Sequence, residues 1–573
     1  MSVGWFTYDP VSIFSSSLLL VISVLILLFE KKFYFNKSIF IVTPILIPIS
    51  YFISSIANSQ NFFSAISGGY QRNFGTATMF ALSILFLFGM SAEINLRQFV
   101  NYGLLSVLVL ANIYGYIQII GLDPIPWTGL HNGVTLTLGN PNFAGALYGM
   151  LSCVVFIKIL QNKKNNFKLL HTGLLISSIY LGFRTNAIQS QLLTFLGCLI
   201  AVNILYRNDT SQISKKLRLL STSGILTSIT FIVLLFTTNL LPNLKTQIFN
   251  QSSIPQRLDY WRTGFEIFKD NAIIGVGADG YQRYAALYRN ANQVVRDGYM
   301  VIPDRSHNVL IDHFANGGLL IGLMWIILVV SVFYALTKII SNFTHNQNYD
   351  IAILGAVWST YIAQSLISPD QILLSTVGYA TGGLIIGLYL KQRKLNTNSE
   401  VKNFSLPFFI RVLFSFVFIF VMVFTISSLK YDSQVKKILN KEINKQEVII
   451  EIINSRFASA KTVELIGVSL IRENSDCIFV NSISDRLLQI DNRSAQAWFM
   501  KAICENQQKS FQNAHNFIEN SLKFDPLNIN YLLGKAELEI IQNKNLEAKV
   551  TLNSIKEINP LEPELLRLEA NIK

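Results

Sequence analysis

Long apolar runs separated by short polar connections dominate the first three quarters of the chain. A segment of roughly 17 to 25 residues with almost no charge is long enough to cross a hydrocarbon core of about 30 Å as a helix. About twelve segments meet this description, namely residues 11–29, 39–56, 74–90, 104–120, 143–159, 169–183, 187–205, 220–241, 317–336, 351–367, 371–390 and 406–426. The pattern predicts an all-α, polytopic membrane domain of about twelve transmembrane helices over residues 1–428.

Composition and charge placement agree with a membrane protein. Of the 573 residues, 51% are hydrophobic and 14% are charged, and the net charge is +13. Lys and Arg collect in the loops after the first, fifth, seventh and eleventh segments, which all fall on one side, whereas residues 121–142 on the other side contain neither. Because short cytoplasmic loops retain Lys and Arg, the side that contains residues 121–142 is expected to face outward. The first segment is interpreted as a retained helix rather than a signal peptide. The basic charge therefore reflects topology, and no nucleic-acid partner is expected.

The remaining residues, 429–573, predict a soluble helical domain on the outer face. Similar stretches begin at Asp491, Asp525 and Asn559, each 34 residues after the previous one. A period of 34 is typical of tetratricopeptide repeats, in which helix pairs bury their apolar faces by stacking on neighbours. The repeat is clearest over 491–573, and residues 431–490 fit either a degenerate repeat or a stalk. Such a domain serves either as a structural cap or as a binding site for a protein partner.

Cysteine and metal-ligand patterns add little. Cys477 and Cys504 occupy helical apolar positions in the C-terminal domain, which fits two free buried thiols at least as well as a disulfide. Neither a metal-ligand spacing nor a Walker motif occurs in the sequence, so no cofactor and no metal ion are expected.

The loop between the eighth and ninth segments, residues 242–316, is long enough to suggest a functional role. It contains Gly275, Gly277 and Gly280 at the G-x-G-x-x-G spacing of dinucleotide-binding turns. That spacing binds a diphosphate only within a βαβ unit, for which the flanking membrane segments leave no room.

Instead, residues 257–268 predict an amphipathic helix at the outer interface, and the glycine turn ends it. Its apolar stripe consists of Leu258, Trp261, Phe265 and Phe268. The alternative is a solvated interfacial loop without a site.

Several stretches resemble the O-antigen ligase and polymerase superfamily. They are "RLDYWRTGFEIFKDNAIIGVGADGYQRY" from Arg257, "DRSHNVLIDHFANGGLLIG" from Asp304, "GGYQRNFGT" around Arg72, "YGYIQIIGLDP", "TLGNPNFAGALYGM" and "YIAQSLISPDQILLSTVGYATGGLIIG". The resemblance covers residues from about 50 to 390. It implies a metal-independent membrane glycosyltransferase of surface polysaccharide biosynthesis in the bacterial cytoplasmic (inner) membrane. The enzyme would transfer a glycan from undecaprenyl diphosphate to an acceptor on the outer face, as an O-antigen ligase does.

The resemblance also implies residue roles. Arg257 and His307 match the loop Arg and the "HN" His of the family and are the expected catalytic residues. Arg72, Arg184, Arg283 and Trp261 are expected to bind the donor diphosphate or glycan, although "FRTNAIQSQ" around Arg184 departs from the usual "SR" pattern. The chemistry fits, because a departing diphosphate gains charge that the guanidinium fork neutralises. A His near its ordinary pKa can accept the proton of an acceptor hydroxyl.

Other functions remain open at this level. The protein could be a polymerase that joins lipid-linked repeat units, or a protein O-oligosaccharyltransferase, so the acceptor is a glycan, a lipid or a protein. A transporter or a non-catalytic scaffold is the alternative from another class. Transport pathways usually place ionisable groups inside the spans, and these segments contain few beyond His171 and Arg411 near their ends.

Overall fold

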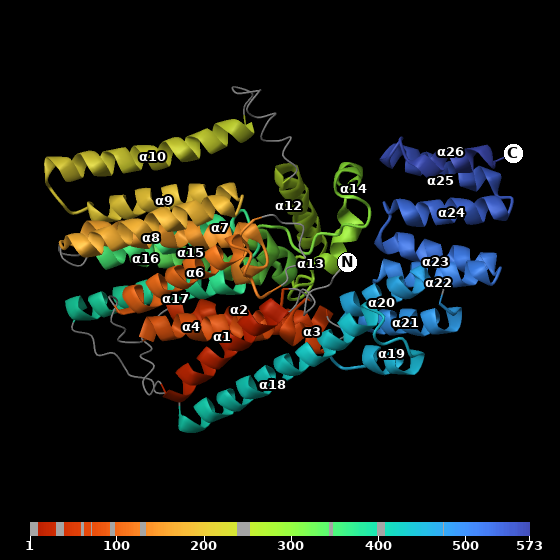
Figure 1. Cartoon of the computed structure of the whole chain (residues 1–573), viewed down its shortest axis with the longest axis horizontal. Coiled ribbons are helices and arrows are strands. Elements are labelled where there is room, and N and C mark those ends of the chain that lie inside the picture. The colour runs from red at the N-terminus through yellow and green to blue at the C-terminus, as the bar shows by residue number, and fades with distance from the viewer. Residues whose placement is uncertain are drawn as a thin grey trace.

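A computed structural model describes residues 10–29, 39–58, 62–69, 72–91, 98–125, 133–237, 253–342, 348–397, 407–473 and 475–572. Every regular element within these ranges is a helix, which confirms the all-α prediction there (Figure 1). The absence of strands from these ranges leaves the glycine motif without a βαβ unit.

Each of the twelve predicted segments overlaps a helix of the described residues. These are α1 (Pro10–Phe29), α2 (Val42–Asn58), α4 (Thr76–Ser91), α6 (Leu105–Ile119), α7 (Pro141–Gln161), α8 (Asn165–Arg184), α9 (Ile188–Leu205), α10 (Gln212–Thr237), α15 (Val309–Asn342), α16 (Asn348–Ser365), α17 (Ile372–Thr397) and α18 (Phe408–Leu439). Among the described residues, five stretches are long and apolar enough to cross a membrane, namely Tyr102–Ile119, Pro141–Gln161, Ile188–Leu205, Val309–Ser341 and Ile372–Arg393. The number of crossings therefore stays a prediction.

The membrane helices are joined by a few short elements. These are η1 (Ile39–Ile41), α3 (Phe62–Ser67), the π-helical η2 (Phe99–Leu104) and η3 (Leu136–Leu138). Helix α7 lies at the centre of the bundle, where it is buried on all sides and packs against α8, α9 and α16. Small residues allow this close approach, since a Cβ on Gly149 would lie 2.6 Å from Leu193.

The C-terminal domain is a stack of eight helices in the described part of the chain. They are α19 (Gln446–Ile453), α20 (Ala460–Arg472), α21 (Cys477–Ile490), α22 (Ala495–Gln507), α23 (Phe511–Phe524), α24 (Ile529–Ile541), α25 (Asn545–Ile558) and α26 (Pro563–Ala570). Helices α22 and α24 begin 34 residues apart, as do α23 and α25. Helix α18 runs across residue 428 into this domain, whose core includes Val435 and Ile438. A disulfide joins Cys477 and Cys504, which settles the pairing that the sequence left open.

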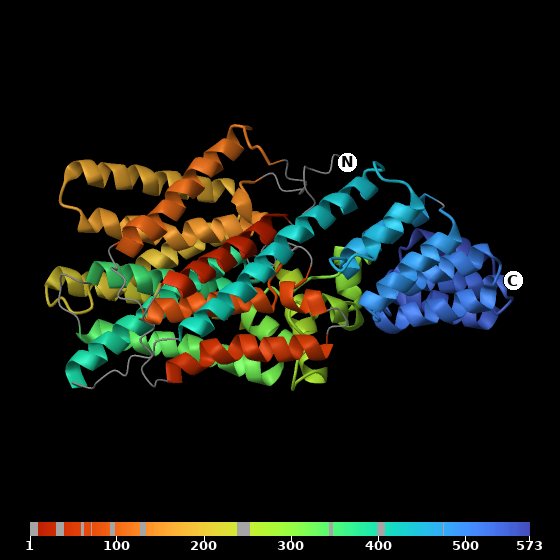
Figure 2. The ribbon, with the colours of Figure 1, turned by 90° about the horizontal axis from the view of Figure 1, so that it is seen from below.

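The described part of the long loop lies between the bundle and the C-terminal domain (Figures 1 and 2). It contains α12 (Ser253–Asp270), α13 (Tyr281–Ala285), η4 (Ala286–Tyr288) and α14 (Ala291–Asp297), and residues 309–316 belong to α15. Helix α12 buries Tyr260, Thr263 and Ile267, whereas Phe265 of the predicted apolar stripe is exposed. The protein therefore covers a different face of α12 from the predicted stripe.

Candidate active site

The glycine turn after α12 fits into a break in α15. At Gly318 the backbone of α15 leaves the helical conformation, so nearby N–H and C=O groups lose their helical partners. The turn replaces these partners, because Val276 N and Gly277 N donate to the carbonyls of Ala315 and Asn316, and Leu319 N donates to Ala272 O. A Cβ at Gly275 would lie 2.5 Å from the Asn316 backbone. The motif therefore holds the loop against α15.

The "HN" pair sits where the loop enters α15. The side chain of Asn308 accepts a hydrogen bond from Ile311 N at 3.2 Å, which is an N-cap contact, and its own amide donates to Leu366 O at 2.9 Å. His307, one residue earlier, has a φ of 59°. Left-handed backbone at a non-glycine residue is uncommon and occurs often at functional sites. Asn73 and Asp279 share this conformation, with φ values of 48° and 55°.

Two ion pairs tie the segment before His307 to other parts of the outer end. Arg72 pairs with Asp304, and Arg305 pairs with Asp279. The other oxygen of Asp279 accepts hydrogen bonds from the backbone N–H groups of Gly69 and Phe74, at 2.9 and 3.2 Å. Arg72 is thus brought to His307, although more than 200 residues separate them in the sequence.

Helix α12 brings Arg257 and Trp261 to the same place. Trp261 Nε1 donates to the His307 carbonyl at 3.5 Å, and the Tyr260 ring lies 5.3 Å from the His307 ring. Arg257 is half-buried, and within the described part of the chain its guanidinium has neither a hydrogen bond nor an ion pair. Burial lowers its pKa, although an arginine stays charged at neutral pH. Among the described residues, Arg257 is therefore a cation near His307 that lacks an anionic partner.

The site keeps His307 neutral. Burial, together with the positive charges of Arg72, Arg257 and Arg305, lowers the pKa of His307 to about 4, and Asp304 only partly offsets this effect. For Asp304, burial by itself would raise the pKa, but Arg72 and other nearby positive charges lower it below its usual range. His307 is therefore free to accept a proton at neutral pH, and Asp304 is an ionised partner for Arg72.

The other two predicted ligands lie outside this group. The Arg283 guanidinium binds the C-terminal domain through Asp491 at 3.1 Å and donates to Asn58 O at 2.8 Å. The side chain of Arg184 is exposed at the end of α8, and its backbone carbonyl accepts a hydrogen bond from Val134 N. The structure thus brings together Arg72, Arg257, Trp261 and His307, and gives Arg283 a contact that the sequence did not predict.

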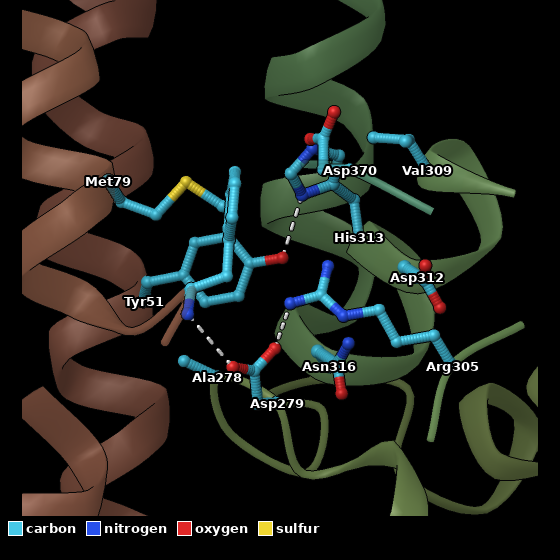
Figure 3. A pocket seen from close by; sticks show the side chains of 11 residues that line it. Tyr51, Met79, Ala278, Asp279, Arg305, Val309, Asp312, His313, Asn316 and Asp370 are labelled. Atoms are coloured by element: carbon cyan, nitrogen blue, oxygen red, sulfur yellow. Dashed lines mark hydrogen bonds and ion pairs between the residues drawn. The ribbon is translucent and has the colours of Figure 1, made fainter. Parts of the chain in front are cut away.

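A small buried cavity adjoins the ion pair formed by Arg305. Figure 3 shows the guanidinium of Arg305 directed toward Asp279, and the Tyr51 hydroxyl hydrogen-bonded to His313 Nδ1 at 2.7 Å. Arg305 Nε, Asp312 Oδ2 and His313 Nε2 are buried there and have no hydrogen-bond partner among the described residues. The space suits about one bridging water molecule. Asp279, Asp304 and Arg305 were not among the site residues expected from the sequence. For Asp304 and Arg305, the available signal was their position as a charged pair directly before "SHN".

Part of the chain that includes this site matches a known family. Residues 173–326 match the family model described as O-antigen ligase. The matched region runs from α8 into α15 and contains Arg184, Arg257, Trp261, Arg283 and His307, but not Arg72. A search of curated proteins gave no match. Together with the membrane-length helices, the match supports a bacterial inner-membrane protein with a role in glycosyl transfer during polysaccharide biosynthesis.

Proposed function

We propose that this protein is a membrane glycosyltransferase that moves a glycan from undecaprenyl diphosphate to an acceptor on the outer face of the inner membrane, as an O-antigen ligase does. The observation that carries the proposal is the half-buried guanidinium of Arg257, which has no ion pair with any described residue and lies near His307, inside the region that matches the ligase family. Such a cation suits a diphosphate, which accepts hydrogen bonds from the guanidinium fork in pairs.

The main steps of the reaction use Arg257 and His307, which this site supplies. An acceptor hydroxyl oxygen attacks the anomeric carbon of the glycan and forms the new glycosidic bond. The bond between that carbon and the phosphate oxygen breaks, and its electron pair leaves with the diphosphate, whose growing charge Arg257 stabilises, with Arg184 as a further proposed ligand. The acceptor proton passes to neutral His307.

Donor binding would prepare His307 for this task. The pKa of His307 is low partly because Arg72, Arg257 and Arg305 surround it. A bound diphosphate would neutralise part of that positive charge, and the pKa of His307 would rise toward the range in which a general base works well. The base thus becomes stronger when the donor is present.

The disulfide supports an outer location for the C-terminal domain. Disulfides such as Cys477–Cys504 persist in oxidising compartments and are rare in the cytosol. This placement agrees with the predicted topology, in which the Lys-rich and Arg-rich loops face the cytoplasm. We propose that the domain consists of tetratricopeptide-like repeats, since the 34-residue offset recurs in two successive helix pairs.

The size of the lipid-linked glycan in cells that carry His307→Ala tests the function and separates ligase from polymerase. Loss of a ligase would strand long glycans on the lipid, whereas loss of a polymerase would leave single repeat units. His171→Ala is a suitable control, because His171 is only partly buried on α8 and its ring contacts its own helix at Phe167 O. If His307→Ala protein accumulates normally in the membrane and neither glycan pool changes, the catalytic role of His307 is refuted.

A further inference from the structure

We propose that the C-terminal domain positions the active site, and that Arg283 and Arg289 are the positioning residues through which it acts. This inference rests on the proposed function. It assigns to the C-terminal domain a role in catalysis, distinct from capping the molecule or recruiting a partner, and it assigns to Arg283 a role other than donor binding.

The contact between the long loop and the C-terminal domain uses equivalent positions of two successive repeat units. Asp491 and Asp525 are 34 residues apart, and they end α21 and α23 with nearly the same backbone conformation, φ of −141° and −144°. Asp491 pairs with Arg283 at 3.1 Å, and Asp525 pairs with Arg289 at 2.6 Å. Two arginines six residues apart in the loop thus bind the same corner of two stacked units.

The Arg289–Asp525 half of the contact is packed like a protein interior. The side chains of Arg289 and Asp525 are 0% and 1% exposed. Arg289 also donates to the carbonyls of Tyr299 and Val301, both at 3.0 Å, and so fixes the segment after α14. Val294 of α14 belongs to the same apolar cluster as residues of α24, α25 and α26. Helix α14 therefore contributes to the core of the C-terminal domain.

A second set of contacts joins the later part of the loop, residues 290–297, to α12 at positions on both sides of Arg257. Gln256 Nε2 donates to Asp297 at 2.9 Å. Asp259 accepts hydrogen bonds from Asn290 at 2.8 Å and from Arg296 at 2.9 Å. Helix α12 in turn contacts His307 through Tyr260 and Trp261. The C-terminal domain, residues 281–301, α12 and His307 therefore form one continuous chain of contacts. Misplacement of a catalytic group by about 1 Å can cost on the order of 100-fold in rate, so a loosened domain would slow transfer.

A charge exchange in the full-length protein tests the proposal. Arg283→Asp and Asp491→Arg are made singly and together, and kcat and KM for transfer from a lipid-linked glycan donor are measured alongside amide hydrogen exchange in α12. Each single variant is expected to lower kcat at least tenfold and to speed exchange in α12. The double variant restores an ion pair of reversed polarity, and is expected to recover kcat to within about threefold of wild type.

Asn559→Ala is the matched control, because Asn559 ends α25 at the equivalent position of the next unit and contacts Glu562 and Leu561 of its own turn. It is expected to keep wild-type rates. If the exchanged pair folds poorly, Asp491→Asn combined with Asp525→Asn is measured instead, and wild-type kcat and exchange in that variant overturn the proposal.

The outcomes separate the two hypotheses. If Arg283→Asp abolishes transfer, Asp491→Arg does not, and the double variant stays inactive, Arg283 binds the donor and the positioning role is wrong. If all three variants match wild type in kcat and exchange, the contact has no positioning role. If the wild-type protein transfers no glycan while exchange in α12 follows the expected pattern, the proposed function fails and the positioning contact stands.

Discussion

The substitution Asp525→Ala should weaken the contact between the loop and the C-terminal domain, because it breaks the buried ion pair between Asp525 and Arg289. The substitution leaves Arg289 charged, fully buried and without its carboxylate partner. Removal of one partner of a buried ion pair typically costs about 3–5 kcal/mol. Arg289 would keep its bonds to the Tyr299 and Val301 carbonyls, so the cost is expected at the lower end of that range. Since each 1.4 kcal/mol is about tenfold, the opened population should rise by at least about 100-fold.

Chymotrypsin cleavage after Tyr299 measures that opened population, because cleavage follows the open fraction when opening and closing are fast. Asp525→Ala should be cleaved at least about 100 times faster than wild type. The joint replacement Asp525→Leu with Arg289→Met removes both charges, and costs mainly the two lost carbonyl hydrogen bonds, about 2 kcal/mol. It should therefore be cleaved more slowly than Asp525→Ala. Equal cleavage of Asp525→Ala and wild type would refute the reasoning, since the pair would then contribute nothing to docking.

Three further predictions concern the active site. Arg257→Ala should lower kcat/KM for glycan transfer by about 10²–10³, the usual effect of losing one charge-stabilising donor. Lys269→Ala, at an exposed position of the same helix, is the control and should keep the wild-type rate. Equal rates for both variants would contradict the role of Arg257. Because the pKa of His307 is about 4, kcat/KM should stay flat from pH 8 to about pH 5 and fall as His307 protonates near pH 4; an acid limb at about 6.5 would show an unperturbed His. Gly275→Ala should lower the free energy of unfolding by about 2–5 kcal/mol, because the new Cβ would lie 2.5 Å from the Asn316 backbone and the residue has a φ of +72°. Thermal unfolding measures this change. Gly173→Ala is the control, because its Cβ would meet nothing within 4 Å.

The low pKa of His307 also affects stability, and the sign follows from proton linkage. An unfolded His titrates near 6.5 and the folded one near 4. The unfolded state therefore binds more protons between these two values, and stability decreases as the pH falls from about 6.5 to 4. Replacement of His307 by Gln removes this contribution, and should flatten the stability profile over that interval.

The sequence predicted several residues of the candidate active site, but it did not predict which other residues they contact. Arg257, Trp261 and His307 could be chosen because family motifs mark them within one loop, and the structure brings them together. The charged pair before "SHN" marked Arg305, but nothing in the sequence indicated that it pairs with Asp279 or that Arg283 contacts Asp491. A charged residue reads the same in sequence whether it faces solvent, substrate or a partner more than 200 residues away.

The sequence by itself determined the main helices. Long apolar segments and a 34-residue repeat can both be read from residues that are close together in the chain. It also marked the glycine turn, although only packing showed that the turn repairs a break at Gly318 in α15. The tertiary structure decided which face of α12 is buried, that Arg257 has no ion pair among the described residues, and where the C-terminal domain docks. These features depend on contacts between distant segments, and the free energy of a charge depends on what surrounds it after packing.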